Sequence, residues 1–302
     1  MPVREPSSLP GGRAVEPSGC SYRHALVGLD LSRVSDLLVS WLPSLQRVGT
    51  RVLTLVHAIP LEEVEHVAAG YPVDRLEEEL RQEALERLKA YAAELRSRGF
   101  EVEILRPVAG VPAVVLAEEA ARLGADYIVV AERGQGWLRR ILLGSTSEEV
   151  AQIADRSVLV SKPYVRAEGE RSLQAPGDPW GGPLLAALAL DEGDEPVLCR
   201  AVEAASRTGA RLVLLHVLEE GEDEEEARRR LEELAERARS RGAGEVEAMV
   251  AKGKPSRAIL GEAARLDANI IFIGAGGERG RELGTTAEAV LRRAKVHVLV
   301  CK

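Results

Sequence analysis

The sequence has no excess of basic residues, few aromatic residues and no long apolar run. Its 302 residues include 40 Lys and Arg against 48 Asp and Glu, for a formal net charge of −8, and aromatic residues make up 3%. Because duplex binding needs a concentrated basic face and single strands are held by stacking aromatic rings, we expect no nucleic-acid partner. No run approaches the roughly 20 apolar residues of a membrane span, and no apolar signal core follows the N-terminus. We therefore expect a cytoplasmic protein without a membrane partner.

Cysteine and histidine are also scarce. The three cysteines, Cys20, Cys199 and Cys301, are an odd number and lie far apart, and the five histidines show no paired ligand spacing. The sequence therefore predicts neither a disulfide framework nor a metal site. His57 and His216 stand at matching ends of two apolar runs, and we interpret them as structural residues or as neighbours of a ligand.

The chain contains an internal duplication. The segment EAARLGAD at 119–126 returns as EAARLDAN at 262–269, and VLVSK at 158–162 returns as VLVCK at 298–302. Each repeat, at roughly 140 residues, is long enough to bury its own core. We therefore predict a disordered tail at 1–20, a first domain at 21–163, a Pro- and Gly-rich linker at 164–182 and a second domain at 183–302.

Short apolar runs alternate with helical patterns within each repeat. In the first repeat a helical pattern covers 75–98, and runs of strand length occupy 24–29, 52–57, 102–105, 127–131 and 158–161. Strands that alternate with helices indicate an α/β fold. In each domain we expect a five-stranded parallel sheet with helices on both faces, a Rossmann-like architecture. Ligands of such sheets bind beyond the carboxyl ends of the strands, where the strand order reverses.

A loop rich in glycine and hydroxyl residues follows the fourth apolar run. It extends from Ala131 to Thr146 and contains Gly134 and Gly144, which let backbone N–H groups approach an anion closely. Ser145 and Thr146 begin a helical pattern, whose first N–H groups and dipole favour negative charge. The loop matches neither the P-loop nor the dinucleotide fingerprint. It predicts a phosphate site; the alternative is that the glycines only form a turn and Ser145 only caps the helix.

Taken together, these residues resemble the universal stress protein family in a tandem form. The phosphate motif of that family is Gly-x-x-Gly, nine residues, then Gly-Ser/Thr, and Gly134, Gly144 and Ser145 fit it with Ala131 in place of the first glycine. Asp30 resembles the acid that ends the family's first strand and meets the nucleotide, and Ala58 follows a segment resembling its second strand, after which the main chain contacts adenine. The resemblance implies an adenine nucleotide alpha hydrolase-like fold.

The resemblance also implies a ligand, ATP or AMP with or without Mg²⁺, and leaves a homo-oligomer open. The implied nucleotide-binding residues, all in the first repeat, are Asp30, Ala58, Ala131, Gly134, Gly144, Ser145 and Thr146. The second repeat has a loop three residues shorter that contains two acids, so we expect it to bind a triphosphate less well. Its candidate positions are Asp191, Val217, Gly274, Gly277, Gly284 and Thr285.

Three functions fit the sequence. The first is a stress-response protein in which a bound nucleotide regulates conformation or partner choice, with at most slow ATP hydrolysis. The second is an adenylating or phosphoryl-transfer enzyme, which requires a catalytic lysine or metal-binding acids near the loop. The third is an interaction scaffold that does not use nucleotide. No nucleophile and base combination stands out, so we expect no catalytic residue. The family's dimer further implies that 158–161 and 298–301 lie near each other.

Overall fold

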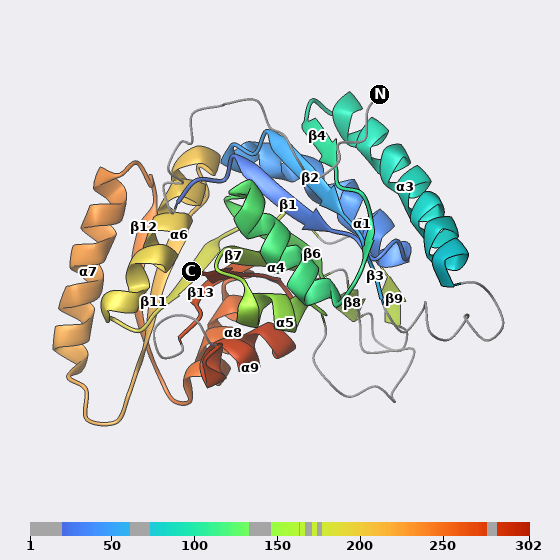
Figure 1. Cartoon of the computed structure of the whole chain (residues 1–302). Helices are drawn as coiled ribbons and strands as arrows, with labels where there is room; N and C mark the ends of the chain where they lie inside the picture. Colours follow the sequence, from blue (N-terminus) through green and yellow to red (C-terminus); the bar gives the residue numbers. More distant parts are fainter. Residues whose placement is uncertain are drawn as a thin grey trace.

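The computed structural model describes residues 20–60, 73–132, 146–162, 164–166, 171–173, 177–276 and 283–302. One continuous sheet of ten strands passes through them in the order β12-β11-β10-β13-β14-β7-β6-β1-β2-β4 (Figure 1). Repeat 1 supplies β1 (His24–Gly28), β2 (Val52–Val56), β4 (Glu101–Ile104), β6 (Tyr127–Ala131) and β7 (Ser157–Ser161). Repeat 2 supplies β10 (Leu184–Leu188), β11 (Leu212–Leu218), β12 (Val246–Lys252), β13 (Ile270–Gly274) and β14 (His297–Cys301).

Helices cover both faces of this sheet. One face carries α1 (Arg33–Trp41), the 3₁₀ helix η1 (Leu42–Val48), α3 (Val73–Ser97), α6 (Glu195–Thr208) and α7 (Glu224–Ser240). The other carries α4 (Pro112–Leu123), α5 (Thr146–Ile153), α8 (Pro255–Arg265) and α9 (Thr285–Arg293). A short 3₁₀ helix, η2 (Glu192–Asp194), precedes α6, and β3 (Ala58–Ile59) pairs with β5 (Val108–Ala109).

The apolar runs form central strands because both of their faces are covered. Alternate residues of β1 enter opposite cores: Val27 packs in the core under α1 and α3, and Leu26 packs in the core under α4 and α5. Both side chains are fully buried. A strand buried on two sides reads as a continuous apolar run rather than as an alternating one. The predicted α/β fold with helices on both faces is therefore confirmed.

The two five-stranded parallel sheets join through their last strands. β7 and β14 pair antiparallel, with Val160 opposite Val298 and Leu159 opposite Leu299, whereas the other pairings in the sheet are parallel. The expectation that these strands lie near each other is confirmed. The antiparallel pairing relates the two repeats as the two halves of a dimer are related, so each half of the sheet has no free edge at the joint.

The prediction that the cysteines form no disulfide was wrong. Cys20, just before β1, is bonded to Cys199 of α6, with the two Cα atoms 5.4 Å apart. The sequence separation of 179 residues gave no local signal, and only the joining of the two sheets brings these positions together. The predicted tail lies outside the described residues apart from Cys20 itself.

The segment predicted as a linker contains a short hairpin and ends in a buried tryptophan where the structure describes it. Two short strands, β8 (Tyr164–Arg166) and β9 (Arg171–Leu173), pair antiparallel. Trp180 is 1% exposed, and its ring lies edge-on to Tyr22 with centroids 6.0 Å apart. This aromatic contact connects the end of the segment to the entry of β1.

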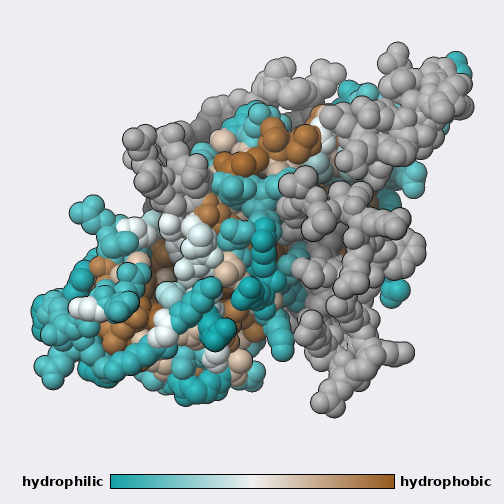
Figure 2. Space-filling view, turned by 90° about the horizontal axis from the view of Figure 1, so that it is seen from below, coloured by the Kyte–Doolittle hydropathy of each residue, from teal (hydrophilic) through white to brown (hydrophobic). Residues whose placement is uncertain are grey.

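The surface offers little apolar area among the described residues. Figure 2 shows that the described part of one face is largely hydrophilic, with apolar side chains exposed in small groups. The exposed large apolar residues are Val108, Val111, Val114 and Ile153. Scattered residues of this kind are normal on a protein surface.

Candidate functional site

The candidate site lies at the carboxyl end of β1, where the strand order reverses. β1 pairs with β2 on one side and with β6 on the other, so the chain leaves these neighbouring strands in opposite directions along the sheet. Asp30 follows β1 and Ala131 ends β6. These two predicted residues therefore lie at the carboxyl ends of neighbouring strands, as expected for a doubly wound sheet.

Hydrogen bonds from the start of α1 hold the Asp30 carboxylate. Its Oδ1 accepts from the backbone N–H of Ser32 at 2.9 Å, from Ser32 Oγ at 2.7 Å and from Ser35 Oγ at 2.7 Å. Ser32 also caps α1 by accepting from Val34 N–H at 3.1 Å. Leu31 adopts a left-handed conformation with φ of 59°, which turns the chain between strand and helix. Asp30 is half-buried and has a fixed orientation.

His57 ties the end of β2 to the end of β1. Its Nδ1 is 2.8 Å from the carbonyl oxygen of Leu29. The next residue, Ala58, is 8% exposed and begins β3, where it lies opposite Val108 of β5. The histidine is therefore structural, and it fixes the position of the main chain at Ala58 relative to Asp30.

A partly buried ion pair stands at the base of the predicted phosphate loop. Lys162 is 6% exposed, and its Nζ donates to Glu132 Oε2 at 2.7 Å and to the carbonyl oxygen of Leu291 in α9. Burial lowers the pKa of Lys162, and the Glu132 carboxylate opposes that shift. Glu132 directly follows Ala131, so this pair connects the first residue of the loop to a helix of repeat 2. Sequence reasoning missed it, although Lys162 and Lys302 recur in the duplicated ending.

Most of the predicted phosphate loop lies outside the described residues. Gly134, Gly144 and Ser145 are among these, so their placement stays a prediction. Thr146 is the first residue of α5 and is exposed. The first turn of α5 also contains Glu148, whose carboxylate is bound by Arg292 of α9 at 2.5 Å.

Repeat 2 reproduces the backbone frame of this site. His216 Nδ1 is 2.9 Å from the Leu188 carbonyl oxygen, as His57 is to Leu29. Leu190 has φ of 63°, and its carbonyl accepts from Arg230, as that of Leu31 accepts from Arg87. The two left-handed leucines and the two histidines therefore align the repeats residue by residue in the segment that follows the first strand of each.

In this alignment of the two repeats, the residue equivalent to Asp30 is Ala189 and not Asp191. Ala189 is the residue just before the left-handed leucine, and it is exposed. Asp191, the candidate acid of repeat 2, takes the position of Ser32 and caps η2 by accepting from Gly193 N–H at 2.7 Å. Repeat 2 therefore has no carboxylate at the position of Asp30.

A second acid in repeat 2 is engaged by the backbone. Asp194 is 8% exposed, and it accepts from Ala189 N–H at 2.9 Å and from Leu190 N–H at 2.6 Å. Burial raises the pKa of Asp194, and these two donors oppose the shift. In repeat 1 the same position holds Ser35, which likewise accepts from the Leu31 N–H at 3.0 Å and in addition donates to Asp30.

The loop of repeat 2 is closed at its base. Gly284 N–H donates to the Ala275 carbonyl oxygen at 2.6 Å, and Gly276, with φ of 68°, forms an isolated bridge with Leu283. A Cβ at Gly284 would lie 2.6 Å from the Gly276 carbonyl oxygen. Gly274 ends β13 and Thr285 begins α9, while Gly277 lies outside the described residues. The Gly284 N–H is thus bonded within the loop itself.

The segment after β11 is acidic. Val217 of β11 is buried, and His216 Nε2 is 3.0 Å from Glu222. A surface hollow here is lined by Leu218, Glu219, Glu220, Glu222, Glu224, Lys252 and Gly253. Lys252 pairs with Glu224 at 2.6 Å, and the hollow keeps a net negative charge that opposes an anionic ligand at this end of repeat 2.

The described residues contain neither a cluster of metal ligands nor a helix that could span a membrane. No group of three or more His, Cys, Asp or Glu side chains is placed there to hold a metal ion. In the same part of the chain, every helix is too short or too polar to cross a membrane.

Comparisons with known proteins agree with the fold and the duplication. The model of the universal stress protein family matches residues 21–162 and again 182–302. A universal stress protein of Mycolicibacterium smegmatis is 29% identical over 92% of this chain and 96% of its own length. One of Methanocaldococcus jannaschii is 25% identical over 47% of this chain and 95% of its own length, so it corresponds to one repeat.

Among solved structures, a universal stress protein from Archaeoglobus fulgidus is similar to this chain over nearly the whole molecule. The two are 25% identical, with a TM-score of 0.74, over 93% of this chain and 97% of the other. The double match of the family model and the ten-stranded sheet agree. The chain belongs to the universal stress protein family and contains two of its domains in tandem.

Proposed function

We propose that repeat 1 binds an adenine nucleotide, ATP or AMP, as a regulatory ligand, and that repeat 2 binds it weakly or not at all. The observation that carries the proposal is the carboxylate of Asp30, which lies where the strand order of repeat 1 reverses. The equivalent residue of repeat 2 is Ala189, which has no carboxylate. The family's motif around Gly134 and Gly144 supports it from the sequence.

The chemistry of Asp30 suits a ribose. A carboxylate accepts hydrogen bonds from hydroxyl groups, and bonds to a charged acceptor are stronger than neutral ones. Three donors from Ser32 and Ser35 fix the orientation of the group before a ligand arrives, so little ordering is lost on binding. The main chain at Ala58, held by the bond between His57 and Leu29, is proposed to contact the base.

The phosphate groups are proposed to bind at the start of α5. The first turn of α5, which begins at Thr146, presents N–H groups that no helical carbonyl can accept from, and the helix dipole favours an anion there. If Mg²⁺ accompanies ATP, the hydroxyls of Ser145 and Thr146 are the groups proposed to reach it. The metal would neutralise phosphate charge when bound.

The nucleotide is proposed to act as a regulator rather than as a substrate that is turned over quickly. The lysine at the base of the loop, Lys162, is already bonded to Glu132 and to the Leu291 carbonyl. Those bonds link the nucleotide-binding edge of repeat 1 to α9 of repeat 2. A ligand that binds one arrangement of this contact better shifts the population toward it without chemistry. A cytoplasmic location remains part of the proposal.

Calorimetry on the full chain tests the site. We expect one nucleotide per chain for ATP and for AMP, and Asp30→Ala should weaken binding about 10- to 100-fold, the loss expected for hydrogen bonds to a charged group. The matched control is Glu192→Ala, which removes an exposed carboxyl from the equivalent end of repeat 2 and should leave affinity unchanged. Two equivalent sites, or equal affinity in Asp30→Ala, would contradict the placement. No binding to the wild-type chain would favour the scaffold.

A steady-state ATPase assay with saturating Mg²⁺ and ATP tests the regulatory role. We expect turnover well below about 1 s⁻¹, the low end of typical enzymes. Faster turnover that disappears in Asp30→Ala would support the enzyme alternative instead.

A further inference from the structure

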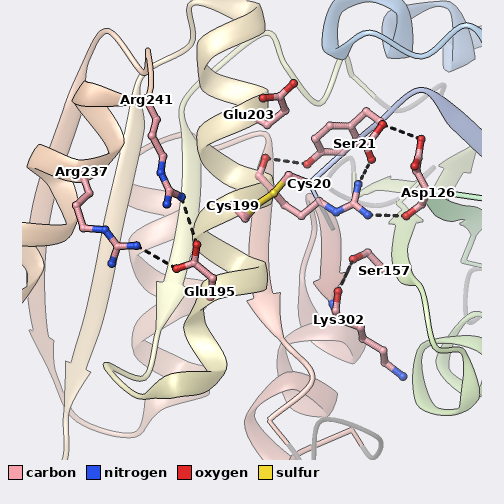
Figure 3. Close-up of a disulfide and its surroundings, with 12 residues drawn as sticks. Cys20, Ser21, Asp126, Ser157, Glu195, Cys199, Glu203, Arg237, Arg241 and Lys302 are labelled. Carbon is pink, nitrogen blue, oxygen red and sulfur yellow. Dashed lines mark hydrogen bonds and ion pairs between the residues drawn. A yellow bond between two sulfur atoms is a disulfide. The ribbon is translucent and has the colours of Figure 1, made fainter. Parts of the chain in front are cut away.

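Polar and aromatic contacts hold the joint between the repeats beside the entry of β1. Arg200 of α6 donates to the Asp126 carbonyl oxygen at 2.5 Å and to the carbonyl oxygen of Ser21 (Figure 3). Its guanidinium lies 5.0 Å from the centroid of the Tyr22 ring. In return, the Tyr22 hydroxyl donates to the Arg200 carbonyl oxygen at 2.9 Å. Arg200 and Tyr22 are both almost fully buried.

The disulfide stands directly beside these contacts. Cys20 precedes Ser21 in the chain, and Cys199 precedes Arg200, so each cysteine neighbours a residue that the joint holds in place. Because the contacts of Arg200 do not depend on the sulfur atoms, they keep the two cysteines close in the absence of the bond. The two thiols of the reduced protein are therefore positioned to pair again.

The accessibility of the cysteines separates this pair from the third cysteine. Cys20 and Cys199 are both half-buried, so neither residue is enclosed in the core. Cys301 is 2% exposed, and burial raises the pKa of its thiol to about 12, so it stays protonated and out of reach. A thiol in that state does not compete in disulfide exchange, which leaves one possible pair.

We propose that Cys20 and Cys199 form a reversible thiol–disulfide site that locks the two repeats together covalently when it is oxidised. The reacting partner is a small-molecule disulfide of the glutathione class. In the reduced state the joint is held by the noncovalent contacts of Arg200 and Tyr22 and by the pairing of β7 with β14. This inference does not depend on nucleotide binding.

The exchange balances in two steps. One cysteine loses its proton, and the thiolate attacks a sulfur of the small disulfide, whose S–S bond breaks and releases one thiolate. The second cysteine loses its proton and attacks the protein sulfur of the mixed disulfide, which releases the second thiolate. Two protein thiols are oxidised by two electrons, and one small disulfide is reduced to two thiols.

Closing the bond stabilises the folded chain. The two cysteines are separated by 179 residues, a span that includes repeat 1. A link across so long a segment removes much of the entropy of the unfolded chain. We expect the oxidised protein to melt roughly 5–10 °C above the reduced one.

Thiol counting in glutathione buffers tests the proposal on the full chain. The folded protein is equilibrated over a range of ratios of reduced to oxidised glutathione, quenched with acid, unfolded and labelled with a maleimide for intact-mass measurement. We expect three labels per chain under reducing conditions and one under oxidising conditions, with a single two-electron transition between them. Melting temperature should rise through the same transition.

Two variants serve as controls. Cys301→Ala should keep the transition and lose one label at every ratio. Cys199→Ser should abolish the rise in melting temperature and leave Cys20 able to take up one glutathione as a mixed disulfide.

Three outcomes would overturn the proposal. The first is three free thiols at the most oxidising ratio. The second is a bond that dithiothreitol removes only after unfolding. The third is an equal melting temperature for the reduced and oxidised wild-type protein.

Discussion

The two repeats share a backbone frame and differ in what that frame presents. Both have a left-handed leucine after the first strand, a histidine bonded to the first strand's last carbonyls and an arginine on the leucine carbonyl. In repeat 1 the frame presents Asp30, and in repeat 2 it presents Ala189. The comparison teaches that conserving the turn after a strand does not conserve the ligand group that the turn carries.

The lysines that end the two repeats, Lys162 and Lys302, are alike in one contact and differ in another. Lys162 donates to a carbonyl of α9, and Lys302 donates to the carbonyls of Gln152 and Ala154 at the end of α5. Each repeat thus places a cation at the C-terminus of the other repeat's last helix, where the dipole favours positive charge. Only Lys162 also holds a carboxylate, that of Glu132. The first repeat therefore has a link between its site and its neighbour that the second lacks.

The largest expected effect is a loss of stability at low pH, and it comes from the residue that begins the last strand of each repeat. This residue is His297 in repeat 2 and Ser157, which does not titrate, in repeat 1. His297 is 4% exposed, and burial lowers the pKa of its imidazole to about 4. Its Nε2 is 2.9 Å from the Gly177 carbonyl oxygen, and its Nδ1 has no acceptor among the described residues. The folded state therefore resists a proton that the unfolded state takes up near pH 6.5.

Since the folded pKa is the lower one, the stability that His297 contributes is present above pH 6.5 and is lost as the pH falls toward 4. We expect a loss of about 3 kcal/mol across this window. Urea unfolding of the wild type and of His297→Asn at several pH values measures it. An equally steep loss in the variant would assign the acid sensitivity to other groups.

The second prediction compares two glycines in the loop of repeat 2. Gly284→Ala places a Cβ 2.6 Å from the Gly276 carbonyl oxygen and 2.9 Å from its carbon, so the backbone must move. We expect a loss of about 2 kcal/mol, as in other overpacked sites. The matched control is Gly274→Ala, whose Cβ would have its nearest neighbour, in Val197, at an ordinary 3.5 Å.

Denaturant unfolding of both variants gives the comparison, and nucleotide titration of Gly284→Ala adds to it. We expect unchanged affinity, because the variant lies outside repeat 1. Equal stability of the two variants would show that the closed base of this loop is not rigid.

The third prediction concerns the two lysines at the joint. Lys162→Met keeps much of the aliphatic volume but leaves the Leu291 carbonyl and Glu132 without their donor. We expect it to cost about 1–3 kcal/mol of unfolding free energy. Lys302→Met should cost less, because Lys302 is more exposed than Lys162 and water can replace it. Thermal unfolding of the two variants checks the order, and a greater loss in Lys302→Met would reverse it.

The sequence alone predicted most of the fold. Strands buried on both sides appear as apolar runs, so the runs at 24–29 and 127–131 marked β1 and β6 to within a residue. The duplicated endings, through their resemblance to the family's dimer, also placed β7 near β14, while their antiparallel pairing was seen only in the structure. The phosphate-loop residues Gly134, Gly144 and Ser145 remain predictions.

The candidate site of repeat 2 was harder to predict, for a geometric reason. The histidines His57 and His216 are 159 positions apart, whereas Arg87 and Arg230 are 143 apart, because repeat 1 has 16 more residues between these points. Asp191 lies 161 positions after Asp30, two more than the 159 that separate the histidines, and it appeared as the candidate acid because it is the first acid after the first apolar run of repeat 2. The left-handed leucines and the bonded histidines together identify Ala189 as the counterpart of Asp30. The disulfide escaped prediction because its partners meet only across the joint.

The smallest expected effect distinguishes the two helix caps that occupy one position of the shared frame. Ser32 caps α1 and also donates to Asp30. Asp191 caps η2, and the residue equivalent to Asp30 in repeat 2 is Ala189, which has no carboxylate. Each cap is expected to contribute about 1 kcal/mol, so Ser32→Ala and Asp191→Ala should reduce stability by similar amounts. Only Ser32→Ala also frees Asp30 to change orientation, and we expect a further loss of nucleotide affinity of roughly threefold to tenfold, one hydrogen bond's worth. Urea unfolding and calorimetry on the same two proteins separate the effects. If both variants lose affinity, or neither does, then the difference between Asp30 and Ala189 is not what makes the repeats unequal.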